Sequence, residues 1–256
     1  MAFLHNRTVS SLAAAIAAAI LVAGCTSSNS QLAAPEPGPS TQGLTATLTI
    51  SPAANSRDVN PTAPVTVEAT DGSLNSVAMT NDEGKEVAGI MTPDRLAWKS
   101  SEPLGYNKKY LLEIVSQAPT GTTSSLATTF STIAPPNQTK VYLTNTAGNP
   151  LVEDGSYGVG TVVVAHFDES ITDRATAERQ LTVTTDPPVT GSWFWVDDQN
   201  AHWRPESYFA PGTHVTATAS IYGVEVGDGL FGEEDSTTSF VVGNSRVSVV
   251  DDATKQ

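Results

Sequence analysis

The first half of the chain alternates between apolar and polar positions with a period of two. The pattern starts at residue 44, recurs in short segments up to residue 132, and is interrupted by breakers rich in Asp, Gly and Pro. Short alternating runs between turn residues are typical of the strands of an antiparallel sandwich. The expected strands are 45–50, 64–69, 74–79, 109–115 and 126–132. Residues 44–134 are therefore predicted to form a first β-sandwich.

A second alternating pattern begins after a short linker, residues 135–138. Its expected strands are 139–143, 161–167, 181–184, 192–196, 201–204, 214–222 and 236–242. Two of these, 192–196 and 201–204, flank four polar residues and predict a hairpin. Residues 171–180 form the one helix candidate, with Thr172 as its expected N-cap and Asp173 in its first turn. The predicted fold class is all-β, with two tandem immunoglobulin-like sandwiches at residues 44–134 and 139–245.

The last segment, residues 246–256, begins with the apolar stretch from Val247 to Val250 and then becomes polar. The last strand expected for the second sandwich already ends at Val242, so this tail has no sheet of its own to join. We expect it to be loosely placed, with solvated backbone groups. The alternative is that it forms an edge strand of the second sandwich.

The N-terminus carries a targeting signal. An apolar run from Val9 to Ala23 follows a short polar stretch that contains Arg7, and it ends in small residues. With Cys25 directly after Gly24, residues 1–24 resemble a bacterial lipoprotein signal peptide, cleaved between Gly24 and Cys25. This resemblance implies acylation of Cys25 and a place on the extracytoplasmic face of the cell membrane. The alternative is an ordinary secretory signal with an incidental cysteine.

Composition narrows the function classes. Residues 25–43 are rich in Ser, Pro and Gly and predict a flexible tether. The formal net charge is −14, and loss of residues 1–24, which contain one arginine and no other charged group, would make it −15. Such acidity disfavours nucleic acid as a partner, because phosphate binding needs clustered Lys and Arg. Cys25 is the sole cysteine, so no disulfide forms within the chain and packed cores must provide stability.

Aromatic residues gather in the predicted hairpin. Trp193 and Trp195 share one face of the first strand, Phe194 takes the other, and Trp203 lies across the hairpin. Large aromatic rings at such positions most often fill the core of a sandwich. The alternative is that the three tryptophans contact a glycan or a protein partner.

No motif points to a metal or a cofactor. His166, His202 and His214 lack metal-ligand spacing, and we interpret them as structural or surface residues. The acidic clusters lie far apart in the sequence, and solvated loops explain them better than calcium binding. No nucleophile elbow and no phosphate-binding glycine loop is present. No cofactor is expected.

Several motifs of the second predicted sandwich form a distinctive set. They are ITDR at 171–174, VTTDPP at 183–188, HWRP at 202–205, YFAPGT at 208–213, IYGV at 221–224 and GDGLFG at 227–232. Together they resemble the immunoglobulin-like region of mycobacterial and related actinobacterial L,D-transpeptidases. The resemblance covers residues 44–245 and is looser in the first sandwich. The tail from Val247 to Gln256 resembles the first strand of the catalytic domain that follows in that family.

This resemblance implies an architecture and a location, but no catalytic residue. The family cross-links peptidoglycan stem peptides, is targeted by carbapenems, and uses a cysteine in a Ser-His-Gly-Cys motif, activated by a nearby histidine. The sequence has no Cys after Cys25 and no Ser-His-Gly. We therefore expect the non-catalytic stalk region of a peptidoglycan L,D-transpeptidase, truncated before the catalytic domain.

A second class of function stays open. The chain would then be a standalone envelope lipoprotein that binds peptidoglycan or envelope proteins and has no enzymatic activity. An active hydrolase is disfavoured, because no nucleophile–base pair can be assembled from the sequence.

Overall fold

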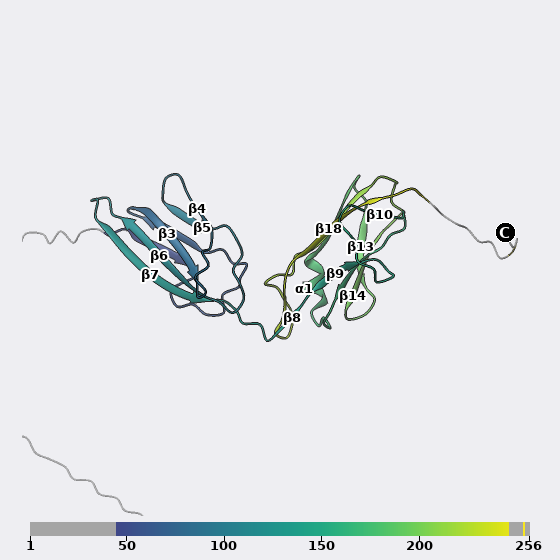
Figure 1. Ribbon diagram of the computed structural model, residues 1–256, viewed down its shortest axis with the longest axis horizontal. Coiled ribbons are helices and arrows are strands. Elements are labelled where there is room, and N and C mark those ends of the chain that lie inside the picture. The colour runs from purple at the N-terminus through teal and green to yellow at the C-terminus, as the bar shows by residue number, and fades with distance from the viewer. Residues whose placement is uncertain (1–44, 246–252, 254–256) are drawn as a thin grey trace, which may run out of the picture. The chain divides into compact units, whose positions relative to one another are not determined.

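The computed structural model describes residues 45–245 and Ala253. The chain divides into two compact units, residues 1–41 and 42–256, and all described residues belong to the second. Nearly all elements of that unit are strands, which confirms the all-β prediction, and they build two sandwiches (Figure 1). The predicted signal peptide, its cleavage site at Gly24 and Cys25, the tether, and the tail apart from Ala253 lie outside the described residues.

The first sandwich consists of seven strands in two sheets. One sheet has the order β1-β2-β5-β4 and the other the order β3-β6-β7, and every pairing is antiparallel. The strands are β1 (Thr47–Ser51), β2 (Thr66–Thr70), β3 (Ser73–Asn81), β4 (Gly89–Met91), β5 (Ala97–Ser100), β6 (Lys109–Gln117) and β7 (Thr123–Ser131).

Strict alternation places the core of the first sandwich between these sheets. Along β6, Tyr110, Leu112 and Ile114 are buried, while the residues between them are exposed. They pack with Trp98 of β5 and Phe130 of β7, and the rings of Tyr110 and Phe130 stack with centroids 5.3 Å apart. The period of two seen in the sequence is thus the period of burial.

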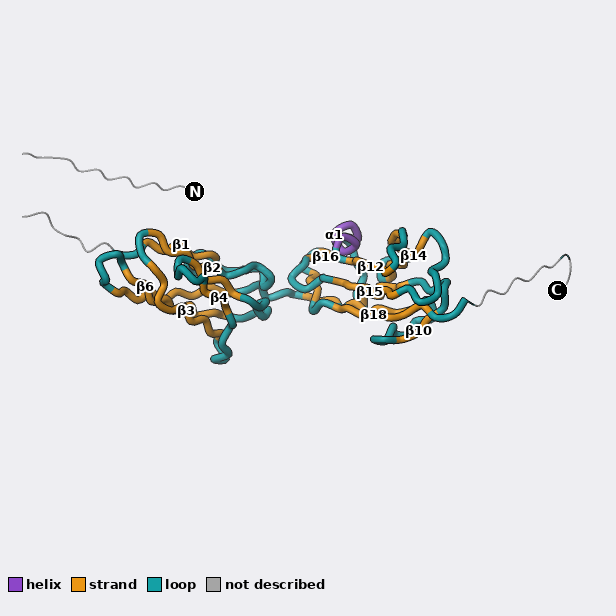
Figure 2. The backbone as a smooth tube through the Cα atoms, turned by 90° about the horizontal axis from the view of Figure 1, so that it is seen from above, coloured by secondary structure: helices purple, strands orange, loops and turns teal. Residues whose placement is uncertain are grey.

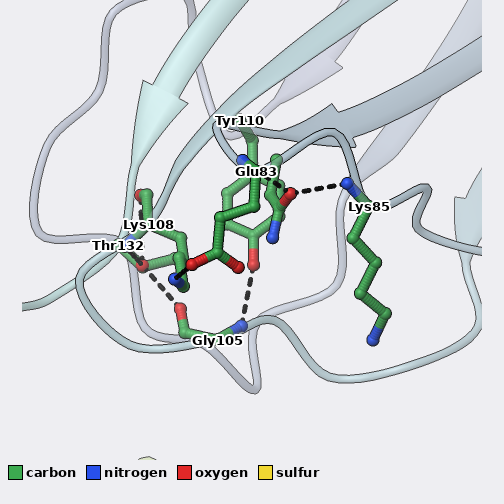
Figure 3. A network of polar contacts seen from close by, with 7 residues as sticks. Glu83, Lys85, Gly105, Lys108, Tyr110 and Thr132 are labelled. Carbon is green, nitrogen blue, oxygen red and sulfur yellow. Dashed lines mark hydrogen bonds and ion pairs between the residues drawn. The ribbon is translucent and has the colours of Figure 1, made fainter.

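Polar contacts fix the loop between β5 and β6 (Figure 3). Tyr110 Oη accepts a hydrogen bond from Gly105 N at 2.8 Å, and Thr132 Oγ1 donates to Gly105 O at 2.7 Å. Lys108 forms an ion pair with Glu83. Because exposed ion pairs contribute little to stability, the two hydrogen bonds to Gly105 hold the loop more than the ion pair does, together with backbone bonds such as that from Asn107 N to Ile133 O.

The second sandwich has two four-stranded sheets and one small sheet. Their orders are β10-β18-β15-β12, β13-β14-β11-β9 and β16-β17-β8. The strands are β8 (Asn137–Thr139), β9 (Val141–Thr144), β10 (Gly155–Tyr157), β11 (Val163–Phe167), β12 (Leu181–Asp186), β13 (Gly191–Trp195), β14 (Asn200–Pro205), β15 (His214–Ala219), β16 (Glu225–Gly227), β17 (Leu230–Gly232) and β18 (Ser236–Val242). The core between the large sheets is centred on fully buried side chains such as Val163, Phe167, Val215 and Phe240.

The helix differs in detail from the prediction. Helix α1 runs from Arg174 to Arg179 and contacts β12 and β16 (Figure 2). Its N-cap is Asp173, whose carboxylate accepts a hydrogen bond from Thr176 N at 3.0 Å. The prediction that Thr172 is the N-cap was therefore wrong. Asp and Thr both serve as N-caps, and the sequence offered the two side by side.

Short strands account for the other differences. The sequence pattern did not predict β4, β5, β10, β16 or β17. Residues Asn137 and Gln138, expected as linker, belong to β8, which pairs in parallel with β17. Strands of three or four residues contain too few positions for an alternating pattern, and their assignment depends on pairing with another segment.

Two tyrosines connect the sandwiches within this unit. Tyr106 Oη donates a hydrogen bond to Gly232 O and accepts one from Gly223 N, both at 2.8 Å. Tyr222 Oη donates to Leu104 O, and the two tyrosine rings meet edge to face with centroids 5.0 Å apart. Burial raises the pKa of Tyr222 to about 12, so its hydroxyl keeps the proton that it donates. We call Tyr106 and Tyr222 the tyrosine junction.

The tyrosine junction requires glycine at position 223. Gly223 has a φ of 78°, and Asn60 Nδ2 donates to its carbonyl at 2.8 Å. A Cβ at this position would lie 2.8 Å from Asn60 Oδ1 and from Thr62 Cγ2. Only glycine combines this positive φ with such a close approach of the Asn60 and Thr62 side chains.

Removal of the Tyr106 hydroxyl tests the junction. Tyr106→Phe leaves Gly223 N and Gly232 O without their partner, so we expect a loss of about 1–3 kcal/mol in the free energy of unfolding. Denaturant unfolding of the full chain measures it. The control is Tyr142→Phe, on a half-exposed side chain of β9, which should change stability by less than about 0.5 kcal/mol. Equal stability of the two variants would contradict the bonding role of Tyr106.

Candidate binding face of the second sandwich

The β13–β14 hairpin turns its tryptophans toward the core. Trp203 is 4% exposed, lies opposite Trp193 across the hairpin, and stacks on Phe209 with ring centroids 6.0 Å apart. Gly191 leaves room for it, because an added Cβ there would collide with the indole ring. Trp203 therefore has no free ring face, and the alternative of glycan stacking does not apply to it.

Trp193 and Trp195 are half-buried and hold neighbouring elements. Trp193 Nε1 donates to Leu181 O at 3.1 Å, and Trp195 Nε1 donates to Glu178 Oε2 of α1 at 3.0 Å. Trp195 also stacks on Phe167, with centroids 5.4 Å apart. Both indole N–H groups are thus used within the fold, as expected for tryptophans at the edge of a core.

The opposite side of the same sheet carries different aromatic residues. Phe194, between the two tryptophans, is 69% exposed, and Tyr142 of β9 is 49% exposed. Cross-strand pairing places Phe194, His202, Val164 and Thr144 in one row across the sheet. Val196, Asn200, His166 and Tyr142 form the next row. We call this side, from Tyr142 to Phe194, the outer face.

A polar network stiffens the middle of the outer face. Asn200 Nδ2 donates to both carboxylate oxygens of Asp197 at 2.9 Å, so its amide oxygen accepts from His166 Nδ1, also at 2.9 Å. Nδ1 of His166 is therefore the donor of this bond, and Nε2 is left for another partner. Hydrogen bonds from Gln199 N and from Asn200 hold the pKa of Asp197 below its usual range. Asp197 is therefore a carboxylate at neutral pH.

A hollow of about 420 Å³ opens beside this network, a size typical of small-ligand sites. Its lining includes His166, Asp197, Asn200 and His202. The His202 ring makes no hydrogen bond to any other described residue. Burial, followed by the nearby Arg204 charge, lowers the pKa of His202, against the opposing effect of Asp197. A neutral His202 ring offers one donor and one acceptor.

A second hollow, of about 380 Å³, lies further along β14. Arg204, Glu206 and Tyr208 line it, and Tyr208 is 69% exposed. Arg204 and His202 are two residues apart on one strand, so their side chains leave the sheet on the same side. Arg204 forms no ion pair within residues 45–245.

The structure brings together residues that the sequence had kept apart. His166 and His202 share one hollow, whereas His214 lies on β15 in the other large sheet. In residues 45–245, no group of three His, Cys, Asp or Glu side chains is arranged to hold a metal ion. The one sequence signal for the outer face was the alternation that sets Phe194 opposite its tryptophan neighbours.

No helix of the described residues is long and apolar enough to cross a bilayer.

Comparison with known proteins identifies the family. A family model described as bacterial Ig domain matches residues 56–225. The chain belongs to the bacterial Ig domain family. This match confirms the immunoglobulin-like sandwiches that the alternating pattern predicted, and the described outer face belongs to the second Ig-like sandwich.

The relatives of this Ig-domain chain confirm the resemblance that its motifs indicated. It is 40% identical over 193 residues to L,D-transpeptidase 2 of Mycobacterium tuberculosis (strain CDC 1551 / Oshkosh), a match that covers 75% of this chain and 46% of the relative. It is 38% identical over 232 residues to L,D-transpeptidase 5 of strain ATCC 25618 / H37Rv, with 89% and 49% covered. The chain thus spans about half the length of these curated relatives.

Solved structures add a weaker likeness. The crystal structure of Mycobacterium tuberculosis L,D-transpeptidase 1 is 20% identical, covers 40% of this chain and 39% of its own, and has a TM-score of 0.26. A score this low supports no inference about the site.

Truncation of Trp203 tests the assignment of the hairpin faces. Trp203→Ala removes a buried ring, so we expect a loss of about 3–5 kcal/mol in the free energy of unfolding of the second sandwich. Phe194→Ala, on the outer face, removes an exposed ring and should cost less than about 0.5 kcal/mol. Denaturant unfolding followed by tryptophan fluorescence measures both. A cost below about 1 kcal/mol for Trp203→Ala would show that its ring is not a core anchor.

Proposed function

We propose that the chain is the non-catalytic Ig-like stalk of a peptidoglycan L,D-transpeptidase, anchored by a lipid on Cys25 at the extracytoplasmic face of the cell membrane. Residues 25–43 would act as the tether, and the two sandwiches would hold a catalytic domain away from the membrane. Similarity to two mycobacterial L,D-transpeptidases over 75% and 89% of the chain supports the family context of this proposal.

The single observation that carries the proposal is the tyrosine junction. A stalk must transmit position from one end to the other, so its modules need fixed contacts in addition to a flexible linker. Tyr106 and Tyr222 supply three hydrogen bonds between the sandwiches, and their partners are backbone groups. Backbone partners hold position better than mobile surface side chains, because only the tyrosine and not its partner could leave the bond by a rotamer change.

The lipid anchor fits the charge of the chain. A protein with a net charge of −14 is repelled by anionic headgroups, so electrostatic attraction would not keep it at a membrane. A covalent lipid on Cys25 supplies the apolar attachment instead, and more than one acyl chain makes such an anchor firm. The small residues Ala23 and Gly24 directly before Cys25 suit the cleavage that exposes the modified cysteine.

The second candidate is a standalone envelope lipoprotein that binds a partner without any catalysis. The outer face favours it, because exposed Phe194 and two polar hollows are more than a spacer requires. The gene sequence past codon 256 separates the two. A reading frame that continues into a Ser-His-Gly-Cys motif supports the stalk, and a stop codon followed by unrelated sequence supports the standalone protein.

Replacement of Cys25 tests the anchor. Cys25→Ala should move the protein from the membrane fraction to the soluble fraction, or leave an uncleaved precursor, because the signal sequence places no other thiol at the cleavage site for the lipid to join. The matched control, Ser27→Ala, should leave the protein in the membrane fraction. Cell fractionation and mass spectrometry of the N-terminal peptide are the measurements. A mature, membrane-bound wild-type protein without lipid mass would contradict the proposal.

Exposure to a carbapenem tests the absence of catalysis. Acylation by such a drug requires a nucleophile, and the sole cysteine of these 256 residues is the one assigned to the lipid. We expect no change in intact mass after incubation of the chain with imipenem, and no exchange of peptide cross-links.

L,D-transpeptidase 1, whose structure in complex with imipenem is known, is the positive control for drug binding. Drug mass on the Cys25→Ala variant would reveal another nucleophile and would contradict the non-catalytic assignment.

A further inference from the structure

We propose that the outer face of the second sandwich binds a neutral polysaccharide strand, with a pyranose ring packed on Phe194 and hydroxyl groups bonded in the hollow at Asp197 and His202. The inference rests on the proposed function and names the ligand class with which such a stalk would contact its surroundings. It uses side chains that neither the core nor the tyrosine junction employs.

The first step is the exposed ring of Phe194. At 69% exposure, the phenyl ring of Phe194 has an apolar face in water, and Val196 nearby is 55% exposed. A pyranose ring has an apolar C–H face of matching shape, so packing one on the other removes both from water. The cross-strand neighbour of Phe194 is His202, which lies at the hollow. A pyranose ring packed on Phe194 would therefore have its hydroxyl groups next to the polar side chains of the hollow.

The hollow supplies both donors and acceptors of hydrogen bonds. A sugar hydroxyl donates one hydrogen bond and accepts others, so its site needs both kinds of group. The hollow has carboxylate oxygens at Asp197, a donor and an acceptor on neutral His202, and the ring nitrogen Nε2 of His166. The bonds from Asn200 to Asp197 and His166 hold this set in place before any ligand arrives. A site ordered in advance loses less entropy on binding.

The charges at the two hollows and of the whole chain favour an uncharged ligand. Arg204 is balanced by Asp197 and Glu206 in the two hollows, and the chain as a whole is strongly acidic. Anionic polymers such as nucleic acids would be repelled. A cationic partner would meet Arg204 at the second hollow, beside His202 along β14. Uncharged hydroxyl groups are not repelled by either kind of charge. They can accept hydrogen bonds from a cationic side chain and donate them to a carboxylate.

The two hollows together extend along much of β14. The two hollows follow one another along β14, from Asn200 past His202 to Arg204, and an exposed aromatic residue accompanies each, Phe194 and Tyr208. A compact ligand would occupy one hollow. A chain of linked sugar rings would occupy both, which favours a polymer over a monosaccharide.

The experiment measures binding of the full chain, purified in detergent, to insoluble peptidoglycan sacculi and to two soluble probes. N-acetylchitotetraose represents the acetylated glycan of the cell wall, and cellotetraose represents a plain glucan. Phe194→Ala should weaken binding about tenfold, as the loss of a central aromatic contact does. Phe194→Tyr, which keeps the ring, should restore it. The control Ile90→Ala removes a side chain that is 67% exposed on the first sandwich and should change nothing.

The soluble probes identify the source of the polysaccharide and test the place of binding. Preference for N-acetylchitotetraose with binding to sacculi indicates wall glycan, and preference for cellotetraose indicates another neutral glycan on the same face. NMR shifts should appear at Asn200, His202 and Phe194.

Three results would overturn the inference: no binding to any probe, equal affinity of Phe194→Ala and wild type, or shifts confined to other residues. The measurements on Cys25 do not depend on this face, so failure here is distinguishable from failure of the stalk proposal.

Discussion

The register of the β13–β14 hairpin is the constraint on which the second sandwich depends. Trp193 lies opposite Trp203, so these rings lie on the core side, while Phe194 and His202 point to the outer face. A slip of one residue would turn the tryptophans into water and bury the phenylalanine and histidine, because side chains alternate strictly along a strand. The bond from Trp195 to Glu178 would break as well. One pairing therefore determines both the core and the candidate binding face.

The sequence predicted the fold where alternation runs over many positions. Strand β6, with nine residues of alternating burial, and the β13–β14 hairpin were both recognisable from the pattern. The alternating pattern did not predict strands that are defined by pairing alone. Strands β8 and β17 are examples, because each has three residues and the two pair although they lie about ninety positions apart in the sequence. The prediction also failed at the helix cap, where Thr172 and Asp173 were equivalent on chemistry and backbone geometry decided between them.

The candidate site was predictable only in part, for a similar reason. Alternation indicated that Phe194 leaves the sheet on the side opposite to Trp193. Nothing in the sequence indicated that His166 would meet Asn200, because that contact requires the register between β11 and β14. The hollow is a product of three strands and two turns, and no single segment carries its signature. The sequence assigns the tryptophans to the core and makes them ligand contacts only as an alternative, and it indicates no such role for the phenylalanine beside them.

Electrostatics decides what such a face can select. At physiological ionic strength, charges act over about 8 Å, so the acidity of the chain repels a polyanion only once it nears the surface. A neutral strand feels no such barrier and also gains no attraction at a distance. Its recognition must come from contact, that is, from the ring of Phe194 and from the fixed donors and acceptors around Asn200. Selectivity on the outer face therefore depends on shape and hydrogen bonding, which the β13–β14 register and the Asp197 network hold in place.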